Sequence, residues 1–261
     1  MPYFTNDGVK IHYEIEGEGP TVVMIHGFAS SLEGNWKQTN WVNFLKDKYQ
    51  LILIDCRGHG KSDKPTDPSQ YGLKMTDDII KLLEHLKIEK ANFLGYSMGS
   101  QLTLTILLSK PQLMKCAILG GFVISFGNET EQPLSKDRRL QIIEALKAES
   151  KDQIKNPVGL RFRVFAEANN ANLHALAAVM GSGLQTQENR ALLKERLKKI
   201  KVPFMSVVGS DDDLLGDKTL FAQIVPDACH FQIQGKDHLT VVPDPKFKMV
   251  VKAFLDYINR R

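Results

Sequence analysis

A serine flanked by glycines marks the place where an apolar run gives way to a helical pattern. The segment reads GYSMG over residues 95–99, with the apolar run 91–94 before it and an apolar helical stretch, 102–108, after it. A turn this tight strains the backbone of the serine, and the residues two before and two after it need to lack side chains so that strand and helix approach. The spacing therefore predicts a nucleophile, Ser97, raised above the strand ends at a helix N-terminus.

Serine is a poor nucleophile unless a base removes its proton and an acid orients that base. Two strand ends in the last quarter of the chain supply such groups. The apolar run 204–208 leads into GSDDD at residues 209–213, and the run 229–233 leads into GKDH at residues 235–238. Because the carboxyl ends of parallel strands meet at one edge of a sheet, an aspartate and His238 are expected beside Ser97.

The elements that must position these residues alternate between strand and helix. The apolar runs are too continuous for half-exposed strands and need cover on both faces, and amphipathic helical patterns lie between them. This alternation predicts an α/β fold with a doubly wound, mostly parallel sheet. The segment 9–15 alternates apolar and polar residues, which favours an antiparallel strand at one edge.

From residue 122 to residue 200 the strand-like runs disappear and helical patterns replace them, at 139–148 and 173–180 among other places. We interpret this range as a helical insertion. The remainder, 1–121 and 201–261, then forms the α/β core.

The composition excludes several classes of protein. The chain has 261 residues, 43% hydrophobic and 25% charged, which is enough for a large core and excludes disorder, collagen and coiled coil. The net charge is +4, but no run of five or six like charges occurs, so no nucleic-acid partner is expected. No stretch approaches the roughly 18 apolar residues of a membrane span, so we expect a cytoplasmic protein without a membrane partner. Cys56, Cys116 and Cys229 lack metal-binding spacing and are expected as free thiols.

Two further motifs carry a resemblance to a known family. HGF at residues 26–28 follows the apolar run 22–25, and DCRGHGKS at residues 55–62 follows the run 51–54. Together with GYSMG and the serine, aspartate, histidine order, they resemble the α/β-hydrolase family. The branch they resemble is that of small, cofactor-free, carboxylesterase-like serine hydrolases with a helical cap. The resemblance covers nearly the whole chain and implies that 122–200 is the cap and that neither cofactor nor metal is needed.

The resemblance also implies which groups surround the nucleophile. The backbone N–H groups of Phe28 and Met98 are expected to form an oxyanion hole for the charge that develops on the substrate oxygen. The acid is expected three residues after the glycine at its strand end, which selects Asp212 from Gly209. Asp213 stays as the alternative, because it could cap a helix that begins at the following leucines.

Position selects the base among seven histidines, and His238, in a loop after the last strand, is the one expected. The family resemblance implies that the histidines of the two loop motifs organise backbone near the site and do not move protons. The other six are His12 in the edge strand, His26 and His59 in the loop motifs, His85 on a helix, His174 in the insertion and His230 within a strand.

Apolar residues of the insertion are candidates for a pocket that holds the acyl or alcohol part of a substrate. Arg161 and Arg163 could meet a substrate carboxylate, although a two-residue spacing does not put both on one helix face. The apolar candidates, with Phe28 of the core, are Phe122, Phe126, Phe162, Phe165, Leu176 and Met180.

The predicted activity is hydrolysis of small to medium, partly apolar carboxylic esters through an acyl-enzyme on Ser97. A serine at this turn excludes the aspartate-dependent relatives, haloalkane dehalogenases and epoxide hydrolases. Lactonase, carbon–carbon bond hydrolase, thioesterase, perhydrolase and acyltransferase activities use the same triad and stay open. The alternative from another class is a slow-turnover ligand sensor, for which the sequence identifies no partner protein.

Overall fold

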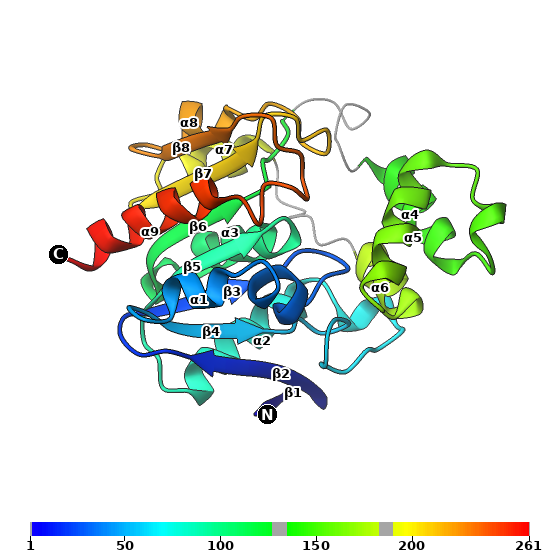
Figure 1. Cartoon of the computed structure of the whole chain (residues 1–261), viewed down its shortest axis with the longest axis horizontal. Helices are drawn as coiled ribbons and strands as arrows, with labels where there is room; N and C mark the ends of the chain where they lie inside the picture. The colour runs from blue at the N-terminus through cyan, green and yellow to red at the C-terminus, as the bar shows by residue number, and fades with distance from the viewer. Residues whose placement is uncertain (1, 127–134, 183–189, 261) are drawn as a thin grey trace.

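The computed structural model describes residues 2–126, 135–182 and 190–260 (Figure 1). Within them, eight strands form one sheet in the order β1-β2-β4-β3-β5-β6-β7-β8, in which β1–β2 and β2–β4 pair antiparallel and all other neighbours pair parallel. This confirms the predicted α/β class. The strands are β1 (Tyr3–Asn6), β2 (Val9–Glu16), β3 (Thr21–Ile25), β4 (Gln50–Ile54), β5 (Ala91–Tyr96), β6 (Met114–Gly120), β7 (Phe204–Gly209) and β8 (Cys229–Ile233).

Helices cover both faces of the sheet, which is why its parallel strands are continuously apolar. One face packs against α2, α3, α7 and α8, and the other against α1 and α9. The antiparallel strand expected at the edge is β2, but β1 lies outside it. The helices are α1 (Trp41–Leu45), α2 (Leu73–His85), α3 (Met98–Ser109), α4 (Lys136–Lys147), α5 (Pro157–Ala168), α6 (Leu173–Gly181), α7 (Arg190–Leu197), α8 (Leu220–Ile224) and α9 (Pro245–Asn259).

Three helices stand apart from the sheet and form a small layer of their own, which we call the cap helices: α4, α5 and α6 (Figure 1). Many of their apolar side chains make a separate cluster that includes Ile142, Leu146 and Leu176, while Ala178 and Val179 of α6 pack with the core cluster. Helix α7 also lies in the range predicted for the cap, yet Leu193 and Leu197 belong to the core cluster beneath the sheet. The range predicted for the cap, 122–200, thus includes one helix, α7, that packs with the core.

None of the helices that the structure describes is both long and apolar enough to cross a lipid bilayer.

Candidate active site

Ser97 occupies a strained turn between β5 and α3. Its backbone has φ 52° and ψ −110°, and its N–H donates to the carbonyl of Gly120 at 2.8 Å. A Cβ on Gly95 would lie 2.3 Å from the carbonyl oxygen of Gly99, and one on Gly99 would lie 2.0 Å from that of Ile25. The steric reason for both glycines is therefore confirmed, and the turn holds the serine hydroxyl at the carboxyl edge of the sheet.

The structure brings Ser97, His238 and Asp212 together from the ends of three strands. Nε2 of His238 lies 3.0 Å from Oγ of Ser97, and Nδ1 lies 2.7 Å from Oδ2 of Asp212. A carboxylate only accepts, so Nδ1 carries the proton and Nε2 is left to accept from the serine hydroxyl. The geometry is that of a nucleophile, a base and an orienting acid.

Of three adjacent aspartates, one faces the histidine. Asp212 is fully buried, and its second oxygen accepts from the N–H of Leu214 at 3.0 Å. Asp211 is exposed and accepts from the hydroxyl of Ser210, while Asp213 is exposed and pairs with Arg161 of α5 at 2.7 Å. Asp213, the alternative acid from the sequence, thus pairs with a cap helix, and Asp212 is the partner of His238.

The loop that follows β3 lies against the nucleophile. A Cβ on Gly27 would be 3.5 Å from the Cβ of Ser97, and the N–H of Gly27 donates to Oδ1 of Asn35 at 3.0 Å. The next residue, Phe28, lines the same cavity as Met98. The two amides expected to stabilise an oxyanion therefore belong to residues that flank Ser97.

His26 and His59 are buried in the backbone behind this loop. Nε2 of His26 accepts from the N–H of Cys56 at 3.0 Å, so its Nδ1 donates to the carbonyl of Gly27 at 2.8 Å. Burial is the main cause that lowers the pKa of His26, and burial lowers the pKa of His59 to about 3. Both rings are neutral supports near neutral pH, and neither contacts Ser97.

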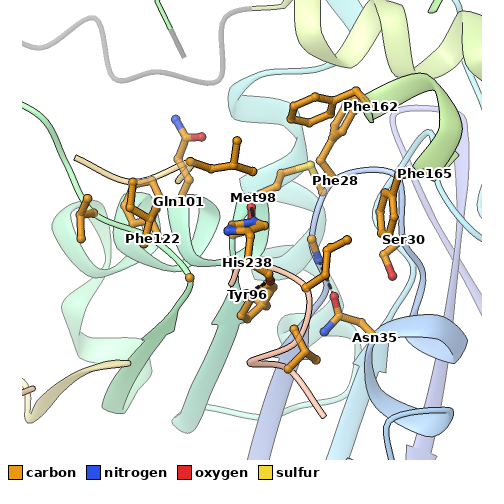
Figure 2. A pocket seen from close by; sticks show the side chains of 18 of the residues that line it. Phe28, Ser30, Asn35, Tyr96, Met98, Gln101, Phe122, Phe162, Phe165 and His238 are labelled. Carbon is orange, nitrogen blue, oxygen red and sulfur yellow. Dashed lines mark hydrogen bonds between the residues drawn. The ribbon is translucent and has the colours of Figure 1, made fainter. Parts of the chain in front are cut away.

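A cavity of about 640 Å³ opens beside the serine, between the sheet edge and the cap helices. Figure 2 shows Phe28, Phe162 and Phe165 on one side of His238 and Gln101 with Phe122 on the other. The space thus extends to both sides of the nucleophile, as an ester with two substituents requires.

Most of the predicted pocket residues line this cavity, and two do not. Phe28, Phe122, Phe162, Phe165 and Met180 are part of its wall. Phe126 instead packs against the core cluster beneath the sheet, and Leu176 is fully buried inside the cluster of the cap helices. The sequence shows that these positions are apolar but not toward which cluster each side chain turns.

The two candidate arginines have different surroundings. Arg161 lines the cavity and donates to both oxygens of Asp213, at 2.7 and 3.3 Å. Arg163 is buried and donates to the carbonyls of Ala145 and Ala148, which ties α5 to the end of α4. Arg163 is a structural residue, so only Arg161 remains in a position to meet a substrate.

Sequence reasoning missed three residues of the site. Asn35 holds the loop after β3, Arg139 of α4 lines the cavity, and Tyr96 donates from its hydroxyl to the backbone carbonyl of His238. Only Tyr96 carried a signal, since it lies within the GYSMG segment itself. Within the described residues, no cluster of histidine, cysteine, aspartate or glutamate is arranged to hold a metal ion.

The fold and the arrangement of Ser97, His238 and Asp212 are typical of a hydrolase. The sequence pattern of the family described as alpha/beta hydrolase fold matches residues 20–141. With this match and the architecture above, the chain has the α/β-hydrolase fold.

Named relatives resemble the chain over nearly its full length. It is 25% identical, over 97% of both chains, to a Bacillus subtilis protein named putative 2-succinyl-6-hydroxy-2,4-cyclohexadiene-1-carboxylate synthase. It is also 25% identical to the 2-hydroxy-6-oxo-6-(2'-aminophenyl)hexa-2,4-dienoic acid hydrolase of Metapseudomonas resinovorans, over 97% of this chain and 89% of the relative. The enol-lactonase from Burkholderia xenovorans LB400 has the same fold, with 21% identity, a TM-score of 0.77 and coverage of 98% and 100%. The family match over residues 20–141 and these relatives support hydrolase activity.

Proposed function

We propose that the protein is a serine hydrolase that cleaves small to medium, partly apolar carboxylic esters through an acyl-enzyme. The observation that carries the proposal is the continuous hydrogen-bonded chain from Asp212 through His238 to Ser97, which ends in a cavity of about 640 Å³. Such a chain makes an otherwise unreactive hydroxyl nucleophilic.

In the first half of the reaction, Nε2 of His238 takes the proton of Ser97 as Oγ attacks the substrate carbonyl. The amides of Phe28 and Met98 stabilise the oxyanion, and each such donor contributes roughly 10²–10³ in rate. His238 then protonates the leaving alcohol, and the acyl group remains on Ser97. Water, deprotonated by the same nitrogen, releases the acid and restores the free serine.

The test is covalent labelling with an organophosphonate that requires only an activated serine. We expect the wild type to be labelled and Ser97→Ala to lose all labelling. Ser109→Ala, on the same helix but bonded to the carbonyl of Thr105 and outside the cavity, is the matched control and keeps full labelling. Labelling that persists in Ser97→Ala would mean that the nucleophile is another residue.

A turnover assay separates the proposed enzyme from the ligand sensor. A panel of p-nitrophenyl esters and lactones of graded size is offered to the wild type. We expect many turnovers per labelled site on at least one neutral ester. A single slow turnover on every substrate would favour the sensor. A preference for lactones would change the proposed activity from esterase to lactonase, with the same three residues.

An acyl substrate that carries a carboxylate is the second candidate. Two guanidinium groups, those of Arg139 and Arg161, line the cavity, and the part of the chain that the structure describes contributes no aspartate or glutamate to that wall. Of three relatives that match over most of their length, two are named for carboxylic acids and one for a carbamate. We test this by comparing p-nitrophenyl butyrate with the mono-p-nitrophenyl ester of succinic acid; a higher kcat/KM for the charged ester would favour this candidate.

A further inference from the structure

Tyr96 is the last residue of β5 and directly precedes Ser97 in the sequence. Its side chain contacts His238, the proposed base. Its hydroxyl donates to the backbone carbonyl of His238, and the two ring centroids are 5.4 Å apart. Figure 2 shows the two rings next to each other, with Tyr96 farther from Phe162 of the cap helices. The residue that precedes the serine therefore also contacts the histidine.

The end of β6 is shaped around this ring. A Cβ on Gly120 would lie 2.9 Å from Cδ2 of Tyr96, and one on Gly121, whose φ is +57°, would lie 2.6 Å from both Cζ and the hydroxyl oxygen. The ring of Phe247 in α9 packs against Tyr96 with centroids 6.3 Å apart, and Tyr96 is 2% exposed. Because these residues pack so closely around it, the ring of Tyr96 has a single position, in which its hydroxyl points to the His238 loop.

The hydroxyl of Tyr96 keeps its proton, and so remains a donor, near neutral pH. Burial, with the charges of Asp212 and Asp237, raises the pKa of Tyr96 well above its ordinary value. A phenol that keeps its proton holds the His238 carbonyl while the imidazole of the same residue gains and loses charge. Asp212 fixes the ring of His238 at Nδ1, and Tyr96 fixes its backbone.

We propose that Tyr96 is a positioning residue that holds the His238 loop at a fixed distance from Ser97. Because β5 carries both Tyr96 and Ser97, the hydrogen bond ties the base to the strand of the nucleophile and maintains the 3.0 Å contact between Nε2 and Oγ. The inference rests on the proposed function, since the position of His238 matters for activity only if Ser97 is the nucleophile.

The test is Tyr96→Phe, which removes the hydroxyl and keeps the ring. We expect the rate of Ser97 labelling by an organophosphonate to fall about tenfold, because the loop carbonyl loses its partner and the base loses its fixed distance. For a cleaved p-nitrophenyl ester, kcat falls by the same factor and KM stays within about twofold. The low-field proton NMR signal of the His238–Asp212 hydrogen bond broadens.

Tyr71→Phe is the matched control. Tyr71 is 4% exposed, donates to the backbone carbonyl of Pro65 at 2.5 Å, and packs against Gly58, a glycine of positive φ, but it does not line the cavity. Both variants lose one buried hydrogen bond, so we expect similar decreases in Tm, whereas only Tyr96→Phe loses labelling rate and kcat.

Two other results are decisive. If Tyr96→Phe is labelled at the wild-type rate and keeps kcat within twofold, Tyr96 is only structural and the inference is overturned. If Ser97→Ala is labelled like the wild type, the proposed function fails instead. A fall in labelling that Tyr71→Phe shares to the same extent would also overturn a specific effect of Tyr96 on His238.

Discussion

Two aspartate–histidine pairs in this protein have nearly the same geometry and different surroundings. Oδ2 of Asp212 lies 2.7 Å from Nδ1 of His238, and Oδ2 of Asp55 lies 2.8 Å from Nδ1 of His12. The side chain of His238 is 13% exposed and that of His12 is wholly buried. A carboxylate that orients an imidazole is therefore present twice, once at β2 and β4 and once after β7 and β8.

The two pairs differ in what the second nitrogen of the imidazole ring contacts. Nε2 of His238 meets the hydroxyl of Ser97 at the cavity, whereas Nε2 of His12 has no hydrogen-bond partner among the described residues and lies 3.6 Å from Oε1 of Glu14. Asp55 also accepts from the N–H groups of Leu32, at 2.8 Å, and Lys61, at 2.9 Å. The buried pair thus holds two loops in place, and an aspartate–histidine pair becomes a base only where its ring opens toward a nucleophile.

Asp212→Asn should lower the activity far more than the same substitution at Asp55 does. An amide presents a donor to Nδ1 and favours the wrong tautomer of His238, so we expect kcat to fall by about 10⁴. Unfolding in urea should show little change. Asp211→Asn and Asp213→Asn, which do not face the histidine, are the controls and should lose little activity; the reverse ranking would assign the acid to a neighbour.

Asp55→Asn should have the opposite profile. An amide cannot accept from both loop N–H groups and from His12 at once, so we expect the free energy of unfolding to fall by about 3 kcal/mol. Measured below the lowered Tm, kcat per labelled Ser97 should stay within about threefold of wild type. A selective loss of kcat in a fully stable variant would contradict the assignment of this pair to structure.

The pH dependence of stability should follow the buried histidines. Burial lowers the pKa of His59 from 6.5 to about 3. Between these values the unfolded chain binds a proton that the folded chain does not, so stability is complete above pH 6.5 and falls as the pH drops. At pH 5 the loss from this residue alone is about 2 kcal/mol.

Urea unfolding of wild type and His59→Asn at pH 7 and pH 5 measures this contribution. The asparagine retains a donor for the carbonyl of Arg57, to which His59 is bonded at 3.1 Å. We expect a shallower decline with falling pH in the variant. Parallel declines would show that His59 takes up no proton on unfolding.

The sequence predicted the parts of the site that depend on backbone topology. Parallel strands deliver whatever follows them to one edge, so Ser97 and His238 could be placed there without coordinates. The direction of single side chains could not be predicted in this way. Phe122 and Phe126 both pack against the core cluster beneath the sheet, yet of the two only Phe122 also lines the cavity.

Contacts between segments far apart in the sequence could not be predicted from the sequence pattern either. Tyr96 occupies a position of the GYSMG segment that the turn leaves free to vary, and its role depends on a carbonyl 142 residues away. Helix α7 has the same helical periodicity as the cap helices, but its buried residues Leu193 and Leu197 belong to the core cluster. Periodicity predicts that a helix has an apolar face and does not say what covers it.

An exposed pair, Asp213 with Arg161, extends the comparison to the surface. Breaking this pair should change the stability of the protein less than the substitutions above. Asp213, next to the buried Asp212, binds Arg161 across the gap between core and cap, and both side chains are 59% exposed. Exposed pairs contribute about 0–1 kcal/mol, so Arg161→Gln should leave the free energy of unfolding within about 0.5 kcal/mol of wild type.

Because Arg161 lines the cavity, the same variant should raise KM for the succinate monoester more than KM for the neutral butyrate ester. Arg138→Gln, one residue before Arg139 on α4 and outside the cavity wall, is the control. A large drop in stability would mean that this pair fastens the cap helices to the core, and an equal rise in both KM values would remove Arg161 from recognition of charge.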